Sequence, residues 1–179
     1  DSSDNSYVVV LSSGNDQTAK LNGFTITGGY GGYYNNGDGA GVYVTSYSSP
    51  TIANCRITHC FAPWNGGGIF VAAYGSVELS KVSFVENHAG YGAGLSLAGG
   101  NNASSLNGCD FIANTASGDS GALYNAGSGL TQVINSRFLG NSALGVVGSG
   151  SGAAATNAQS SQALYVNCLF HRNTGLGDG

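Results

Sequence analysis

The side chains that could carry acid–base chemistry in this sequence are nine carboxylates and three histidines. Enzymes that cleave polysaccharides need two or three carboxylates converging in one groove, or an Asp-based calcium site beside a basic residue. The sequence has no Asp-Asp pair, and no Ser-His-Asp arrangement stands out. We therefore expect this protein not to be an enzyme. The acids are Asp1, Asp4, Asp16, Asp38, Glu78, Glu86, Asp110, Asp119 and Asp178, and the histidines are His59, His88 and His171.

Two short runs have the oxygen-rich, glycine-containing character of calcium loops, residues 35–39 (NNGDG) and 118–121 (GDSG). Neither recurs with the regularity of calcium-binding nonapeptide repeats. Asn-Gly and Asp-Gly pairs also form ordinary tight turns, and we favour this interpretation. The sequence thus predicts no cofactor and no metal site, with calcium as the alternative.

The charge content is unusually low. Only 8% of the residues are charged, against about a quarter in an average globular protein. A net charge of −4 with five Lys and Arg residues argues against a nucleic-acid partner, which needs clustered basic side chains. No run of residues is apolar enough to predict a membrane span. The surface must therefore consist mainly of neutral polar side chains, which provide little electrostatic repulsion between copies.

An internal repeat organises the whole chain. Equivalent apolar anchor positions recur at intervals of 31, 27, 27, 27 and 32 residues, and the segment around each anchor alternates apolar and polar residues. A repeat of this length without helical periodicity predicts short β-strands joined by Gly- and Asn-rich corners. We therefore predict an all-β fold, a parallel β-helix of about six coils with little or no helix. The anchors are Ile26, Ile57, Phe84, Phe111, Phe138 and Phe170.

Stacking the repeats predicts which residues share a column along the solenoid. The anchors form the innermost column, and the positions two and five residues before them, Phe24 and Leu21 in the first coil, should also be core. A polar outward column places Asp110 beside Arg137. Three residues after the anchors, one corner carries a predicted ladder of stacked amides. The ladder residues are Asn87, Asn114, Asn141 and Asn173.

Four cysteines do not fit a disulfide framework. Cys55, Cys109 and Cys168 share a column, but neighbours in it lie two coils apart, roughly 9.6 Å by the spacing of strands. A disulfide needs Cα atoms within about 7 Å. A Cys55–Cys60 bond would require a distorted coil. We expect these side chains to act as small buried hydrophobic groups.

Two insertions lengthen a chain that we otherwise treat as one domain, residues 1–179. They are residues 28–39 and 145–161. The first is rich in tyrosine, which gives much contact area at a low cost in conformational entropy. Trp64, the only tryptophan, lies in a corner loop. It either contacts a binding partner or covers the edge of the core. The possible contact surface consists of Tyr30, Tyr33, Tyr34 and Trp64.

The repeat resembles a known family. A Gly-Gly turn before a strand, as in Gly67-Gly68-Ile69, is followed by a Phe-x-x-Asn motif, as in Phe84-Val85-Glu86-Asn87, and both recur in later coils. This pairing is similar to the polymorphic outer-membrane-protein repeats of bacterial right-handed β-helix surface proteins. The resemblance covers nearly the whole chain and implies a right-handed β-helix with an extracellular, adhesive or structural role. It brings no catalytic residues.

These observations lead to one expected function and one alternative. We expect a non-catalytic extracellular or cell-surface β-solenoid that acts by contact, as an adhesive or structural module. Its partner would be a second copy, added end to end into filaments, or a cell-surface glycan. Open β-helix ends present unpaired strand edges, which favours self-association. The alternative is a carbohydrate-active enzyme, a polysaccharide lyase or hydrolase, or a glycan-binding β-helix, with its site on the inserted loops.

Overall fold

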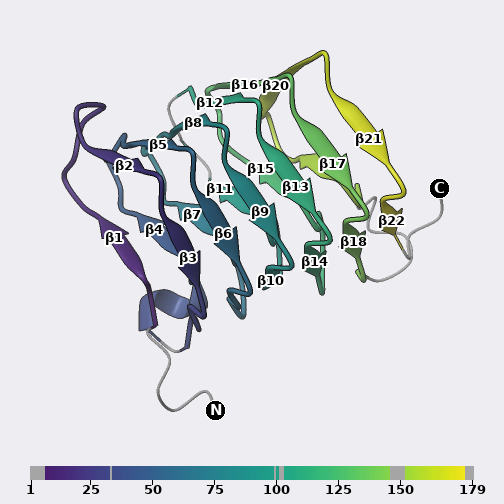
Figure 1. Ribbon diagram of the computed structural model, residues 1–179, viewed down its shortest axis with the longest axis horizontal. Coiled ribbons are helices and arrows are strands. Elements are labelled where there is room, and N and C mark those ends of the chain that lie inside the picture. Colours follow the sequence, from purple (N-terminus) through teal and green to yellow (C-terminus); the bar gives the residue numbers. More distant parts are fainter. Residues whose placement is uncertain (1–6, 33, 99, 101–102, 146–151, 176–179) are drawn as a thin grey trace.

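The fold is a stack of short parallel strands wound into coils around one interior (Figure 1). The computed structural model describes residues 7–175, except 33, 99, 101–102 and 146–151. Three sheets of six strands and one of four run along the stack, and each strand pairs in parallel with its equivalents in the neighbouring coils. Strands next to each other in sequence lie in different sheets, so each coil passes from sheet to sheet. This is the predicted β-helix of about six coils, and the single described helical element is a short 3₁₀ turn, η1 (Tyr34–Gly37).

Each sheet collects one strand from every coil. The first sheet contains β1 (Val10–Ser12), β4 (Val42–Val44), β7 (Ile69–Val71), β11 (Leu95–Leu97), β15 (Leu123–Asn125) and β19 (Ala155–Asn157). The second contains β2 (Lys20–Asn22), β5 (Thr51–Ala53), β8 (Glu78–Ser80), β12 (Ser105–Asn107), β16 (Leu130–Ile134) and β20 (Gln162–Val166). The third contains β3 (Thr25–Thr27), β6 (Arg56–Thr58), β9 (Ser83–Val85), β13 (Asp110–Ile112), β17 (Arg137–Leu139) and β21 (Leu169–His171).

A fourth, narrow sheet was not among the features predicted from the repeat. It contains β10 (His88–Ala89), β14 (Thr115–Ala116), β18 (Ser142–Ala143) and β22 (Thr174–Gly175). These strands follow directly on the four asparagines of the predicted ladder. Because the same corner recurs in the four coils, the residues after it arrive in matching register and their backbones pair.

Two corners in every coil require a left-handed backbone conformation. The residues three before and two after each anchor all have positive φ. Glycine adopts this conformation without steric cost, whereas other L-residues are strained by roughly 1–2 kcal/mol. The six coils therefore share one backbone path around the third sheet. The corner residues are Gly23, Asn54, Lys81, Gly108, Asn135 and Asn167 before the anchors, and Gly28, His59, Glu86, Ala113, Gly140 and Arg172 after them.

Ala113→Gly should stabilise the protein by up to about 1 kcal/mol, because glycine relieves the strain at φ 52° but loses more freedom on folding. The matched control is Ala116→Gly in β14, which should destabilise because Ala116 is fully buried and is not among the positive-φ residues. Urea unfolding midpoints at an unchanged slope measure both effects. Equal losses in the two variants would contradict the proposed role of the corner.

The core consists of columns of stacked side chains. The anchors are paired in register from Ile26 to Phe170, and the rings of the last four stack with centroids 4.6 to 4.8 Å apart. The glycines directly before β7 and β11 make room for two of these rings. A Cβ atom on Gly94 would lie 2.7 Å from the ring of Phe111, and one on Gly68 would lie 2.9 Å from that of Phe84. This contact explains why the Gly-Gly turn and the Phe anchor recur together.

Two predicted core positions are wrong at the edges of the stack, Phe24 in the first described coil and the anchor Phe170, which is 47% exposed, in the last. Phe24 is 57% exposed, although Cys55, Val82 and Cys109 in the same column are buried. Phe24 belongs to the first described coil, where β3 has a neighbour on one side only. Leu21 in this coil, and Tyr165 and Cys168 in the last, are half-buried for the same reason.

The asparagine ladder is a continuous chain of buried hydrogen bonds. The Oδ1 atom of Asn114 accepts from the backbone N–H of Asn87 at 3.1 Å and from its Nδ2 at 3.0 Å. Asn114 Nδ2 donates to the carbonyl of Phe84 and to Oδ1 of Asn141, both at 3.0 Å. Asn141 binds Asn173 in the same way. The ladder thus ties the corner of each coil to the anchor of the coil before it.

The polar residues and cysteines follow the predicted columns. Arg137 donates two hydrogen bonds of 2.7 Å to the carboxylate of Asp110 on the neighbouring coil. All four cysteines are free. Burial raises the pKa of both Cys60 and Cys109 to about 11, so these thiols stay protonated at neutral pH. Among the described residues, no helix is long and apolar enough to cross a membrane.

Candidate functional site

The first candidate site, which we call the loop face, is built by the segments that lead from the asparagine corner to the first sheet. The inserted segment 28–39 lies against residues 61–65 of the next coil. Gly31 N–H donates to the Phe61 carbonyl at 2.7 Å, and Trp64 N–H donates to the Gly37 carbonyl at 3.1 Å. The rings of Tyr30 and Phe61 stack with centroids 5.1 Å apart. The insertion is therefore packed onto the solenoid.

Two hollows on the loop face share Pro63 and Trp64 in their linings. The larger has a volume of about 600 Å³ and the smaller about 280 Å³. Trp64 is 59% exposed and lines both, which favours its interpretation as a contact residue. The larger hollow is lined by Tyr7, Tyr30, Gly32, Asn36, Gly37, Pro63 and Trp64, and the smaller by Pro63, Trp64, Gly90, Tyr91, Ser117, Gly118, Asp119 and Gly145.

The predicted contact residues fall only partly on this face. Tyr30 and Trp64 line the larger hollow together. Tyr33 lies outside the described residues, and Tyr34 is described only by its backbone, in η1. Two tyrosines of the hollows, Tyr7 and Tyr91, were missed because nothing in the repeat singles them out. Tyr7 packs over Gly32, where an added Cβ atom would lie 2.5 Å from its ring.

Glycine backbones form the floor of the smaller hollow. A Cβ atom on Gly90 would lie 2.6 Å from the carbonyl oxygen of Trp64, and one on Gly118 would lie 2.9 Å from that of Gly90. Gly118 N–H donates to the Gly90 carbonyl at 2.8 Å. Side chains at these two positions would clash with the neighbouring coil, so glycine lets the coils pack closely at this hollow.

The two runs with calcium-loop character behave differently in the structure. In the first, Asp38 Oδ1 accepts hydrogen bonds from Asn65 N–H at 3.0 Å and from Asn65 Nδ2 at 2.8 Å, so this carboxylate joins two coils. Partial burial raises its pKa, against the opposing effect of the Asn65 bonds. In the second run, Asp119 lines the smaller hollow. Among the described residues, no three His, Cys, Asp or Glu side chains gather as a metal site.

One cluster of titratable groups was missed at the sequence level. His59 Nε2 lies 2.8 Å from Glu86 Oε2, and His59 Nδ1 lies 2.8 Å from Thr58 Oγ1. His59 and Glu86 both stand two residues after an anchor, so the repeat could have revealed the contact. Their side chains are 62% and 53% exposed, and neither lines a hollow of the loop face. At such exposure the pair is a weak surface interaction.

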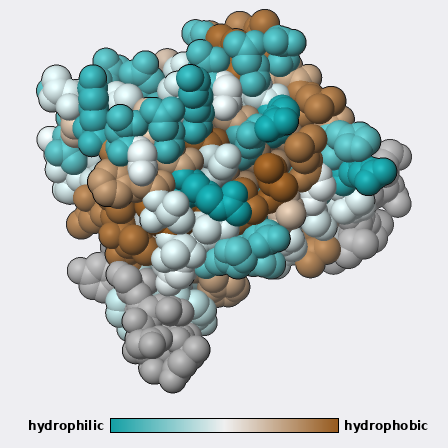
Figure 2. Space-filling model, viewed as in Figure 1, coloured by the Kyte–Doolittle hydropathy of each residue, from teal (hydrophilic) through white to brown (hydrophobic). Residues whose placement is uncertain are grey.

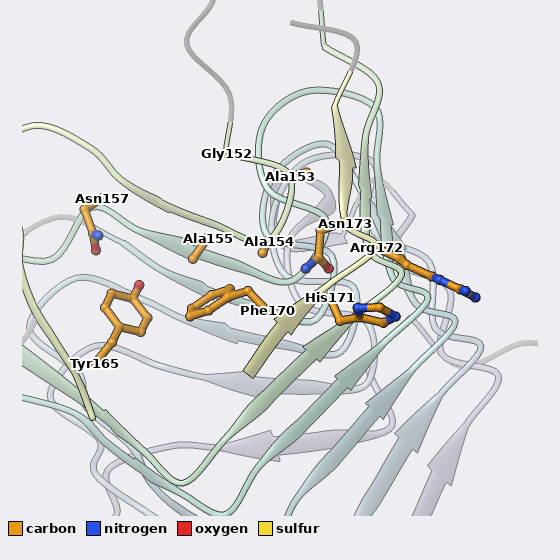
Figure 3. A pocket seen from close by; sticks show the side chains of 10 residues that line it. All are labelled: Gly152, Ala153, Ala154, Ala155, Asn157, Tyr165, Phe170, His171, Arg172 and Asn173. Atoms are coloured by element: carbon orange, nitrogen blue, oxygen red, sulfur yellow. The ribbon is translucent and has the colours of Figure 1, made fainter. Parts of the chain in front are cut away.

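The second candidate site, which we call the open coil face, lies at the end of the stack. It is the side of the last described coil (β19–β22) that faces away from the coil before it. It contains a hollow of about 510 Å³ lined by Gly152, Ala153, Ala154, Ala155, Asn157, Tyr165, Phe170, His171, Arg172 and Asn173. Figure 3 shows the rings of Tyr165 and Phe170 lying in this hollow, with the Arg172 side chain directed away from it. Phe170 is 47% exposed, whereas Phe138 one coil earlier is fully buried. Within the described residues, the core columns are thus uncovered at this end of the stack.

The outer surface of the third sheet offers no comparable site. Figure 2 shows hydrophobic residues scattered among hydrophilic ones over the face that Figure 1 presents. Val85, Ile112 and Leu139 follow their anchors by one residue and pair in register. None of the three is exposed, so they form no projecting patch.

Coils of parallel strands stacked around one apolar interior define the protein as a β-helix, a class of solenoid. Residues 2–177 match the family model described as a right-handed β-helix region. The chain thus belongs to the right-handed β-helix family. No curated protein and no solved structure matched the sequence.

Proposed function

We propose that this chain is a non-catalytic extracellular β-solenoid that acts by contact, as a structural or adhesive module of the cell surface, and that it self-associates end to end. The open coil face carries the proposal. Among the described residues, each strand of the last coil pairs on one side only, and the core ring of Phe170 is exposed there. Unpaired parallel edges beside open apolar columns are a template for another coil.

The first described coil of a second copy has the features needed to pair with the last coil of this one. In the described part of the chain β1, β2 and β3 also end their sheets, and Phe24 is exposed. Residues 21–28 and 165–172 follow the same path, with left-handed corners at Gly23 and Gly28 in one and at Asn167 and Arg172 in the other. A second copy can therefore place Ile26 on Phe170 and Leu21 on Tyr165 in register.

The asparagine ladder limits the strength of this junction. Asn173 N–H would require a side-chain acceptor on the next coil, as Asn141 N–H has in Asn173 itself. Gly29 occupies the equivalent position in the first coil and offers none. The contact joins unlike faces, so it propagates into filaments instead of closing. We expect reversible, concentration-dependent rods. The similarity to polymorphic outer-membrane-protein repeats supports the extracellular part of the proposal.

Phe170→Glu should weaken association at least tenfold, about 1.4 kcal/mol, because the junction would bury an unpaired charge. Light scattering over a range of concentrations, with electron microscopy of the same samples, measures this. Asn107→Glu is the matched control, since it adds the same charge at an exposed site on a middle coil and should assemble as the wild type does. A wild-type chain that stays monomeric at every concentration, or equal assembly by Phe170→Glu, would refute the proposal.

A further inference from the structure

Two exposed tyrosines stack on each other at the corner between the first and second sheets. Tyr47 lies in the turn that joins β4 to β5, and Tyr74 lies at the equivalent position one coil later, in the turn that joins β7 to β8 (Figure 1). Their ring centroids are 5.4 Å apart, and the ring planes differ by 8°. Tyr47 is 76% exposed and Tyr74 is 52% exposed. The pair therefore bridges two neighbouring coils at a surface that dissolved reagents can reach.

The backbone of each turn fixes the direction in which its tyrosine projects. Ser48 N–H donates to the Thr45 carbonyl at 3.1 Å and closes the first turn. Gly75 N–H donates to the Ala72 carbonyl at 3.0 Å and closes the second. Both tyrosines have a φ of 64°, and no other Tyr, Phe or Trp among the described residues has positive φ. Because the two turns share this conformation, which usually favours glycine, their side chains leave the backbone in the same direction and stack.

The next coil carries glycine at the same position. Gly100 has a φ of 75°, and its carbonyl accepts a hydrogen bond of 3.1 Å from Tyr74 N–H. A Cβ atom on Gly100 would lie 3.2 Å from the Tyr74 ring, so the glycine packs against that ring. The Tyr74 ring thus lies between Gly100, which has no side chain, and the ring of Tyr47.

We propose that Tyr47 and Tyr74 are a site of oxidative modification, at which a haem peroxidase using hydrogen peroxide joins the two rings as a dityrosine. Each phenol loses one electron to the oxidised enzyme and its hydroxyl proton to water, which leaves a neutral phenoxyl radical. The two radicals form a bond between the ring carbons ortho to their oxygens, and the hydrogens on these carbons move to the oxygens as the phenols reform. The pair loses two hydrogens in total, and one hydrogen peroxide becomes two water molecules.

Stacking supplies the proximity that this coupling needs. A radical on one ring already has the other phenol beside it, and two groups held together in one chain react as if each were highly concentrated. Exposed side chains change rotamer within picoseconds to nanoseconds, so the two ring edges can turn toward each other. The bond would link two coils that no disulfide joins, since all four cysteines are free.

A second pair of tyrosines provides an internal comparison. The rings of Tyr91 and Tyr124 have centroids 5.5 Å apart, but their planes are tilted by 51° and both residues are half-buried. Burial, with the nearby Asp119, raises the pKa of Tyr124. Oxidation to the neutral radical must release the phenolic proton, so both access and proton loss are less favourable here. We expect the exposed pair to be linked and this pair to stay largely unlinked.

Trypsin separates the two outcomes, because it cleaves after Arg56. Tyr47 then lies in peptide 21–56 and Tyr74 is the single tyrosine of peptide 57–81, whereas Tyr91 and Tyr124 share peptide 82–137. The whole chain is treated with a haem peroxidase and hydrogen peroxide, reduced, and separated on a denaturing gel. The monomer band should show dityrosine fluorescence and should yield peptides 21–56 and 57–81 joined with the loss of two hydrogens. Linked protein should also unfold at a higher urea concentration, since a cross-link restricts the unfolded chain.

Tyr47→Phe should lower the yield of joined peptides about tenfold or more, because phenylalanine keeps the stacked ring but forms no phenoxyl radical. Tyr91→Phe is the matched control and should be linked as the wild type is. The same reaction on Phe170→Glu, in which end-to-end association is suppressed, keeps the result independent of filaments. The proposal is overturned if the wild-type monomer contains no link between the two peptides, if Tyr47→Phe is linked equally well, or if coupling occurs mainly between chains or within peptide 82–137.

Discussion

Phe111→Ala should lower the free energy of unfolding by about 3–5 kcal/mol, the range typical of deleting a fully buried aromatic ring. Phe111 has no exposed surface and stacks between Phe84 and Phe138 at 4.6 and 4.8 Å. The ring also fills the space over Gly94 that a side chain would otherwise occupy. Its removal opens a cavity in the middle of the column, and the short strands on either side cannot close it without losing register. Chemical unfolding followed by circular dichroism measures the loss.

Phe24→Ala is the matched control for this prediction. It removes the same ring from the same solenoid, but Phe24 is 57% exposed on the first described coil. The loss there should stay below about 1 kcal/mol, since most of the ring remains in water in the folded protein. If the two substitutions cost the same, the anchors do not form the core.

The sequence was sufficient to predict the repeat and its columns, for a physical reason. A parallel stack places equivalent residues on top of one another, so a position that must be apolar in one coil must be apolar in the next. Anchors such as Phe84 and Phe138 could therefore be aligned without any structure. The same logic identified Asp110 and Arg137 as neighbours, and the ion pair lies where the alignment put it. Aligning the repeats does not predict burial correctly in the outermost coils, where Phe24 has a neighbouring coil on one side only.

The loop face could be predicted only in outline. Tyr30 and Trp64 stood out because tyrosine-rich insertions and single tryptophans are conspicuous in a repeat. Tyr7 and Tyr91 did not, since their place beside the hollows depends on how loops of different length fold over neighbouring coils. Loop paths follow no period, so no alignment of the repeats reveals them. The contact of His59 with Glu86 differs, because both lie in one column and a search of outward positions would have found it.

Asn114→Ala should cost roughly 2–4 kcal/mol, because it leaves several buried polar groups without partners at 1–3 kcal/mol each, less what relaxation recovers. The Asn87 amide loses its acceptor, and the Phe84 carbonyl and Asn141 Oδ1 lose a donor. Asn107→Ala is the matched control: its amide is exposed and accepts one side-chain bond of 3.3 Å from Asn135, so the loss should stay below about 1 kcal/mol. Equal losses would mean that the buried ladder contributes no more than a surface amide.

Asn114→Asp separates the ladder's geometry from simple loss of packing. The carboxylate keeps an acceptor for Asn87 but turns an oxygen toward the Phe84 carbonyl and Asn141 Oδ1, both acceptors. Burial and these contacts favour the protonated form, so the folded-state pKa should lie above the unfolded value of about 3.9. The folded state then binds the proton more tightly than the unfolded state. The variant should be most stable below the unfolded-state pKa and lose stability as pH rises through the folded-state pKa. Unfolding midpoints of this variant relative to wild type, measured from acid to neutral pH, test the sign. A difference that does not change with pH would mean that Asn114 does not donate at this corner.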